Sequence, residues 1–126
     1  MNNLLVDTHV LLWALSSPES LSPLARAALV EPDNEVFVSA VTAWEISIKT
    51  AIGKLRAPSD LEQQVRRLRF RPLPITFEHG LAVRDLPMIH RDPFDRMLIV
   101  QAKAHGLTLL TSDKAIMQYD VATMAT

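Results

Sequence analysis

The chain has 126 residues, which is close to the most common size of one domain and leaves no room for a second hydrophobic core. Hydrophobic residues make up 48% of the chain and charged residues 21%, a composition that excludes wholesale disorder. The formal net charge of −1 argues against a globally basic nucleic-acid-binding protein, and the absence of cysteine excludes disulfides, thiol nucleophiles and thiolate-bound metals.

Short apolar runs alternate with helix signals along the whole chain. In chain order we expect a strand at residues 4–6, a helix that begins after Asp7, a helix at 24–30, a strand at 36–38, a helix that ends near Ile52, an amphipathic helix at 61–70, an edge strand at 72–75, a short helix at 77–83, a buried helix at 93–105, a strand at 107–110 and a weaker strand at 121–124. Parallel strands need helical crossovers between them. The pattern therefore predicts an α/β fold, a single domain in three layers (α/β/α) with a central parallel sheet of about five strands.

Particular residues mark where the predicted helices begin and end. Ser39 or Thr42 can cap the helix that follows the second strand, and Gly53 closes that helix. Asp92 is placed to cap the buried helix near the C-terminus, and Gly106 ends it.

Acidic residues follow most of the predicted strands. Asp7 comes directly after the first strand, and Asp113 follows the fourth strand after two hydroxyl residues. Glu45 lies about a turn and a half into the helix after the second strand, and Asp92 and Asp95 stand at the start of the buried helix. Because parallel sheets bind ligands beyond the carboxyl ends of their strands, we expect these acids to converge on one cleft.

Each acid taken singly has a simpler structural explanation. Asp7, Asp92 and Asp113 can cap helices or turns, and Glu45 can complete a capping box begun by Thr42. Capping does not explain why most strand exits at one edge carry an acid, because clustered carboxylates repel one another unless a cation neutralises them. A cluster of oxygen ligands suits Mg²⁺ or Mn²⁺, so the pattern indicates metal-assisted phosphodiester hydrolysis.

Three long strings carry a resemblance that covers essentially the whole chain. They are LLVDTHVLLWAL near the N-terminus, VFVSAVTAWEISIKTAIGKL in the first half and HRDPFDRMLIVQAKAHGLTLLTSD in the last third. In their order and spacing they resemble the PIN-domain ribonucleases, in particular the VapC-type toxins of bacterial toxin–antitoxin pairs. The resemblance implies a PIN-like domain in which the strands lie in the order third, second, first, fourth and fifth.

By this resemblance, four acids form the catalytic and metal-binding tetrad: Asp7, Glu45, Asp95 and Asp113. They are expected to bind Mg²⁺ or Mn²⁺, directly or through water, and to help orient the attacking water. Thr8 and Ser112 match small hydroxyl positions beside the acids and are expected to hydrogen-bond them. Asp92 belongs to the matching Asp-Pro-Phe-Asp-Arg string, but its main expected role is to cap its helix.

Positive charge is concentrated in the middle of the chain. Residues 49–71 carry seven lysine or arginine residues against two acids. The candidate phosphate contacts are Lys49, Arg66, Arg67 and Arg69, with Arg96 beside the third acid as a further one. A solvated helix face explains the arginines equally well, so both interpretations stay open.

Other chemistries lack their sequence signatures. The four histidines form no His-Glu-x-x-His string, and neither a phosphate-binding glycine loop nor a Gly-x-Ser-x-Gly string occurs. His9 is expected to pack or to lie at the surface. Trp13 and Trp44 lie on apolar helical faces and are expected in the core rather than as platforms for stacked bases.

The sequence therefore predicts a metal-dependent endoribonuclease toxin that hydrolyses RNA and is inhibited by a cognate antitoxin protein. By resemblance we expect a homodimer, and we expect a cytoplasmic protein without membrane contact because neither a signal peptide nor a long apolar run occurs. RNA as the substrate rests on the resemblance alone, and a nuclease acting on DNA is a weaker possibility. The alternative from another class is a non-catalytic RNA- or protein-binding module on the same scaffold.

Overall fold

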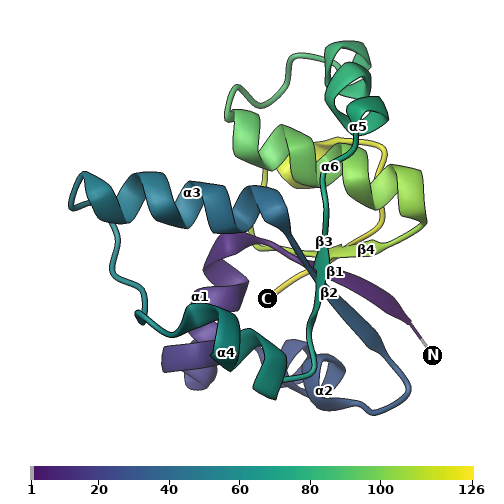
Figure 1. Cartoon of the computed structure of the whole chain (residues 1–126). Helices are drawn as coiled ribbons and strands as arrows, with labels where there is room; N and C mark the ends of the chain where they lie inside the picture. The colour runs from purple at the N-terminus through teal and green to yellow at the C-terminus, as the bar shows by residue number, and fades with distance from the viewer. Residues whose placement is uncertain (1) are drawn as a thin grey trace.

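The computed structural model describes residues 2–126, which form a central sheet with helices on both sides (Figure 1). The strands are β1 (Asn3–Val6), β2 (Glu35–Ser39), β3 (Arg71–Leu73), β4 (Thr108–Leu110) and β5 (Thr123–Met124). The α-helices are α1 (Thr8–Ser16), α2 (Pro23–Val30), α3 (Ala40–Ala51), α4 (Leu61–Arg67), α5 (Phe77–Ala82) and α6 (Pro93–His105). Short 3-10 helices are η1 (Pro18–Ser20), η2 (Val83–Asp85) and η3 (Ile116–Gln118).

The sheet is parallel and its strand order is β3-β2-β1-β4-β5. In the centre, Leu5 of β1 lies opposite Phe37 of β2 and Leu109 of β4. The β1 side chains Leu4, Leu5 and Val6 are each 0% exposed, as expected for a strand covered on both faces. The predicted three-layer α/β fold with five parallel strands is confirmed, and so is the strand order that the resemblance implied.

Apolar side chains pack in two clusters, one on each face of the sheet. Because successive side chains of a strand point to opposite faces, Leu4 and Val6 join one cluster and Leu5 joins the other. Leu11 of α1 packs in the first cluster, and Ile99 of α6 packs in the second. Among the helices of residues 2–126, we find none with the length and apolar character needed to cross a bilayer.

Helix α4 is shorter than the predicted helix at 61–70. It ends after Arg67, because Arg69 has a left-handed backbone with a φ of 62°. The N–H of Phe70 then donates to the carbonyl of Val65 at 3.2 Å, which is the hydrogen bond of a Schellman-type helix end. An arginine in this conformation costs roughly 1–2 kcal/mol relative to a right-handed one, so sequence propensity did not predict the end.

Other helix ends follow the predicted signals. Ser39, rather than Thr42, caps α3, since its Oγ accepts from the N–H of Val41 at 3.0 Å. Asp92 caps α6 by accepting from two backbone N–H groups of its first turn. Gly106 ends α6 with a φ of 63°, as the predicted helix end requires. Of these caps, Ser39 fixes where the chain leaves β2 at the edge that holds the acids.

Candidate active site

The four acids of the predicted tetrad lie in one cleft beyond the carboxyl ends of the strands. The cleft has a volume of about 390 Å³, enough for a hydrated ion and a phosphate group. Besides the four acids, it is lined by Thr8, His9, Lys49, His90, Asp92 and Ser112. The structure therefore brings together the tetrad and the three residues expected beside it.

Asp7 is positioned by the turn from β1 into α1. Its backbone N–H donates to the carbonyl of Leu110 at 3.2 Å, and its Oδ1 accepts from the N–H of Val10 at 2.8 Å as the N-cap of α1. The residue is only 7% exposed. Burial raises the pKa of its carboxyl above the ordinary value, although hydrogen bonds from Thr111 and Val10 act in the opposite direction. Asp7 is thus both a helix cap and a buried acid of the cleft.

Glu45 lies past the first turn of α3 and faces α1. The Thr8 hydroxyl donates to its Oε1 at 2.6 Å, and the Lys49 ammonium pairs with its Oε2 at 2.5 Å. The hydroxyls of Thr8 and Thr42 lie 3.3 Å apart. The predicted capping box between Thr42 and Glu45 is therefore wrong, because α3 begins at Ala40 and Glu45 lies too far along it. The predicted hydrogen bond between Thr8 and an acid is confirmed.

Asp92 and Asp95 stand at the amino end of α6. Asp92 Oδ1 accepts from the N–H of Phe94 at 2.8 Å and from that of Asp95 at 3.2 Å, which confirms its capping role. Burial, followed by the charge of Asp92, raises the pKa of Asp95 to about 7, although His90 lowers it. Burial first, and the charge of Asp92 second, thus oppose ionisation of Asp95 in this cleft.

Asp113 follows β4 after Thr111 and Ser112. Its Oδ1 accepts from the N–H of Ala115 at 2.8 Å, so it caps the turn after the strand. Thr111 is buried, and its Oγ1 accepts from the N–H of Asp113 at 3.0 Å. Ser112 lies exposed at the rim of the cleft. Thr111 is therefore the hydroxyl residue that positions Asp113 after β4. A hydrogen bond from Ser112 to an acid of the cleft stays a prediction.

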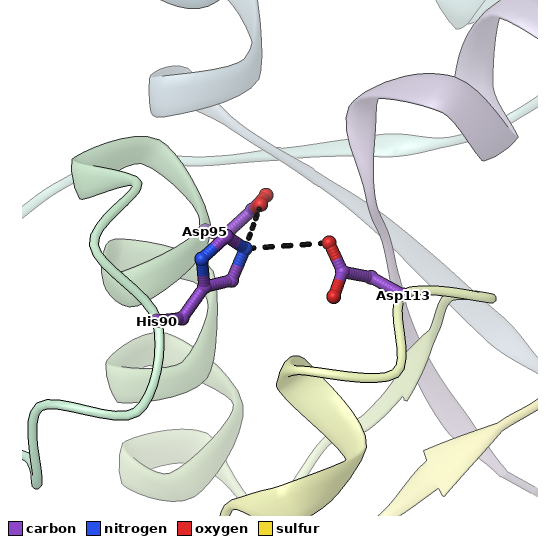
Figure 2. A group of neighbouring side chains, drawn as sticks. All are labelled: His90, Asp95 and Asp113. Atoms are coloured by element: carbon purple, nitrogen blue, oxygen red, sulfur yellow. Dashed lines mark hydrogen bonds and ion pairs between the residues drawn. The ribbon is translucent and has the colours of Figure 1, made fainter.

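His90 is a cleft residue that the sequence did not single out. Its Nε2 lies 2.9 Å from Asp95 Oδ2 and 3.3 Å from Asp113 Oδ2 (Figure 2). It thus joins two acids that come from different elements. The signal available in the sequence was its position two residues before Asp92 in the HRDPFDR string. This position brings His90 to the cleft only because the loop before α6 folds back onto it.

Arg96 is buried, and its prediction as a phosphate contact is wrong. It is 6% exposed. Its Nη1 donates to the carbonyls of Pro87 and His90 at 3.0 and 3.3 Å, and its Nη2 donates to the carbonyl of Val83 at 3.0 Å. The Tyr119 hydroxyl lies 3.2 Å from Nη1. The guanidinium therefore holds the loop that carries His90 instead of facing solvent.

Among the other predicted basic contacts, Lys49 lies in the cleft and the three arginines lie elsewhere. Arg66 pairs with Glu62 at 3.0 Å on an exposed face of α4. Arg67 and Arg69 line a separate groove at the amino end of β2, whereas the acids lie beyond the carboxyl ends of the strands. The expectation that the basic segment borders the acidic cleft is thus correct at Lys49 only, and binding of nucleic acid by the arginines stays a prediction.

Trp44 is 59% exposed, so the expectation that it lies in the core is wrong. Its ring meets the ring of Phe94 edge-on, with centroids 5.3 Å apart. The Lys49 ammonium lies 5.9 Å from the centre of the Phe94 ring. Neither ring lines the cleft itself, but through Lys49, which does, the aromatic pair lies beside it.

The donor groups of the cleft fit a hard divalent cation. They are carboxylates from four parts of the chain and the imidazoles of His9 and His90, with no thiolate. Mg²⁺ and Mn²⁺ prefer oxygen ligands and keep open positions for water and phosphate. Burial, with a smaller contribution from repulsion, raises the pKa values of Asp7 and Asp95, so the ionised cluster is unfavourable by itself and a bound cation would offset this cost.

Asp95→Asn is expected to stabilise the protein in EDTA above pH 7 and to lose this effect toward pH 4. The carboxyl titrates near 3.8 in the unfolded chain and at about 7 in the fold, so the folded protein holds an extra proton between these values. The free energy of unfolding of the wild type therefore falls as pH rises through that window, by on the order of a few kcal/mol from this group. Urea denaturation at pH 4.5 and pH 8 measures the difference in the free energy of unfolding between Asp95→Asn and the wild type. Equal stabilities of the two proteins at pH 8 would contradict a raised pKa of the Asp95 carboxyl.

Comparisons with known proteins agree with the fold. A family model described as PIN domain matches residues 4–122. Ribonuclease VapC22 of Mycobacterium tuberculosis (strain ATCC 25618 / H37Rv) is 28% identical over 123 residues, which cover 92% of this chain and 91% of that protein. The structure also resembles that of VapBC2 from Rickettsia felis bound to a DNA fragment from their promoter, with a TM-score of 0.70 at 13% identity over 98% of each chain.

A further similar structure is VapBC-5 from Mycobacterium tuberculosis, a member of the VapBC family of toxin-antitoxin systems. Its TM-score is 0.56 at 17% identity, and the match covers 99% of this chain and 98% of that one. Both structural likenesses concern the fold, while the family model extends from β1 almost to the end of the chain. The chain therefore belongs to the PIN domain family.

Proposed function

We propose that the chain is a metal-dependent endoribonuclease that hydrolyses RNA phosphodiester bonds and acts as the toxin of a toxin–antitoxin pair. The observation that carries the proposal is the convergence of Asp7, Glu45, Asp95 and Asp113 on one cleft. Burial raises the pKa of two of these acids, so the cluster opposes its own ionisation unless it binds a cation. The similarity to a ribonuclease supports RNA as the substrate.

The tetrad would hold Mg²⁺ or Mn²⁺ through Asp7, Asp95 and Asp113, with Glu45 completing the set. When bound, the ion supplies an activated water and neutralises charge on the phosphate. Glu45 also positions two neighbouring side chains, because its Oε1 accepts from the Thr8 hydroxyl and its Oε2 pairs with the Lys49 ammonium. It thereby keeps the Lys49 ammonium at the cleft, where that charge can meet a phosphate oxygen of the substrate.

RNA would approach across the rim formed by Lys49, Trp44 and Phe94. Exposed aromatic rings stack on unpaired bases, and an ammonium beside them contacts the sugar-phosphate backbone. Trp44 is exposed, and its edge-on contact with Phe94 restrains both rings at the border of the cleft. This arrangement favours single-stranded RNA over a paired helix, whose bases are stacked on one another.

The proposed protein partners are a cognate antitoxin, which would cover or enter the cleft, and a second copy of this chain. The similarity to VapBC-5, from a family of toxin-antitoxin systems, supports the antitoxin. The proposed place of action is the cytoplasm, since RNA is found there.

Lys49→Gln is expected to raise the KM for RNA about tenfold and to weaken its dependence on salt. Loss of one charge-assisted contact to phosphate removes roughly 1.4 kcal/mol of binding and lowers the salt slope by about one. Cleavage of a fluorescent RNA at several salt concentrations measures both effects. Lys103→Gln is the matched control, because Lys103 is exposed in the last turn of α6, does not line the cleft and is expected to leave KM unchanged. An unchanged KM and salt slope in Lys49→Gln would remove Lys49 from the RNA contacts.

Sequencing of RNA 5′ ends in cells that express the wild type or Asp7→Asn tests the proposed function. We expect new 5′ ends at defined sites with the wild type and none with the variant, at equal protein levels. Identical 5′-end profiles for the two proteins would contradict a catalytic role and favour the non-catalytic binding module.

A further inference from the structure

The position of His90 between two acids adds a nitrogen atom to the ligand groups of the cleft. Its Nε2 is 2.9 Å from Asp95 Oδ2 and 3.3 Å from Asp113 Oδ2, and Figure 2 shows the imidazole nitrogen between the two carboxylates. The three side chains are all partly buried, and their ligand atoms lie within 4.8 Å of one another. They come from the loop before α6, the first turn of α6 and the turn after β4.

These separations match those of neighbouring ligands on one small divalent ion. In an octahedral site with ligands at about 2.1 Å, adjacent ligand atoms lie about 3 Å apart. A hydrogen bond from an imidazole N–H to a carboxylate oxygen has nearly the same length. The contacts of Nε2 with Asp95 and Asp113 therefore hold it at the spacing that such an ion requires from each oxygen, and the ligand atoms of all three residues lie within 4.8 Å of one another.

The backbone of His90 is fixed on both sides. Its N–H donates to the Tyr119 hydroxyl at 2.8 Å, and its carbonyl accepts from Arg96 Nη1 at 3.3 Å. The Tyr119 hydroxyl in turn donates to the carbonyl of Pro87 at 2.8 Å. Buried groups thus hold the loop in one conformation and aim the ring at the cleft.

The imidazole presents the lone pair of Nε2 when the ring proton moves to Nδ1, and the hydrogen bond of 2.9 Å between Nε2 and Asp95 would then be replaced by the bonds of both atoms to the ion. A neutral imidazole that binds a metal through Nε2 carries its proton on Nδ1. The nearest hydrogen-bond partner of Nδ1 is the backbone N–H of Asp92, at 3.5 Å, which is the long limit of a hydrogen bond. Hydrogen bonding at Nδ1 therefore does little to oppose the change of tautomer that metal binding at Nε2 requires.

We propose that His90 Nε2 is a ligand of the divalent ion beside Asp95 and Asp113, and that it gives the cleft a preference for Mn²⁺ over Mg²⁺. Both ions prefer oxygen ligands, but Mn²⁺, as a transition-metal ion, accepts an imidazole nitrogen more readily than Mg²⁺, which is held by oxygen ligands and water. The inference rests on the proposed function to the extent that the tetrad must bind a divalent ion. It goes further by adding a ligand outside the tetrad and by ranking the two metals.

Pulsed electron paramagnetic resonance of the full chain loaded with Mn²⁺ tests the assignment directly, because it detects coupling between the metal and a ligating ¹⁴N nucleus. We expect this coupling in the wild type and its loss in His90→Gln, which keeps a polar side chain of similar reach. His9→Gln is the matched control, since His9 also lines the cleft, and its coupling is expected to equal that of the wild type. Calorimetry on the same proteins is expected to show that His90→Gln weakens Mn²⁺ binding about tenfold and Mg²⁺ binding about two- to threefold at most.

The outcomes separate the inference from the proposed function. Mn²⁺ binding without ¹⁴N coupling in the wild type would overturn the role of His90 and leave the tetrad intact. Loss of the coupling in His9→Gln instead would assign the nitrogen to His9 and equally overturn it. Absence of any Mn²⁺ binding by the wild type, or binding that Asp95→Asn leaves unchanged, would overturn the proposed function itself.

Discussion

Asp7→Asn is expected to abolish RNA cleavage and to leave the fold intact. Asp7 is buried at the carboxyl end of the central strand, and its carboxylate is one of the groups that would hold the ion. Asparagine has the same shape and can still accept the hydrogen bond from the N–H of Val10 that caps α1. Burial also raises the pKa of the Asp7 carboxyl, so loss of its charge does not destabilise the fold. We expect kcat/KM to fall by about a thousandfold or more, which corresponds to about 4 kcal/mol.

The measurement pairs cleavage of a labelled RNA with thermal unfolding of the same samples. Asp33→Asn is the matched control, because Asp33 is exposed in the turn between α2 and β2 and makes no contribution to the cleft. We expect Asp33→Asn to retain wild-type cleavage and both variants to unfold within a few degrees of the wild type. Cleavage by Asp7→Asn within about tenfold of the wild type would exclude Asp7 from the catalytic tetrad.

Arg96→Met is expected to destabilise the protein by about 3–5 kcal/mol. The guanidinium is buried and donates to carbonyls of Val83, Pro87 and His90, and methionine replaces the stem of the side chain without these donors. The partly buried carbonyls of Val83 and His90 would then lose a charged donor, while that of Pro87 would keep the Tyr119 hydroxyl, and each carbonyl left without a partner costs about 1–3 kcal/mol. The loop that carries His90 would lose its main attachment to α6.

Urea denaturation at pH 7 gives the loss of stability from the shift of the midpoint. The matched control is Arg91→Met, since Arg91 is exposed five residues earlier and its replacement is expected to change stability by less than about 0.5 kcal/mol. A loss of less than about 1 kcal/mol in Arg96→Met would show that the network around Arg96 and Tyr119 does not hold this loop.

The main elements of the fold were predictable because local signals agree with the final packing. The continuous apolar run of β1 indicates a strand buried on both faces, and Gly106 marks the end of α6 where the structure has a left-handed residue. The order of the strands was not readable in this way, because it depends on how each crossover passes over the sheet. It came from the family resemblance. The end of α4 at Arg67 was missed because an arginine rather than a glycine adopts the left-handed position.

Asp7, Glu45 and Asp113 were predictable because they follow β1, β2 and β4, and the carboxyl ends of parallel strands meet at one edge. Asp95 follows no strand directly and was assigned to the tetrad by the family resemblance. His90 and Arg96 were not, since their roles depend on a loop whose path is set by tertiary contacts with Tyr119 and α6. Arg96 beside an acid suggested a phosphate contact, but the loop from Val83 to His90 covers it. Trp44 was assigned to the core from the periodicity of α3, which does not distinguish a buried face from the rim of a cleft.

Cleavage of RNA by the purified protein in Mn²⁺, in Mg²⁺ and in EDTA tests the central claim most directly. The convergence of four acids on one cleft predicts internal cleavage of a single-stranded RNA with either ion, faster with Mn²⁺, and none in EDTA. Full restoration of activity is expected when Mn²⁺ is added back to the EDTA-treated sample. Cleavage that persists in EDTA, or its absence with both ions in a correctly folded sample, would contradict a metal-dependent ribonuclease.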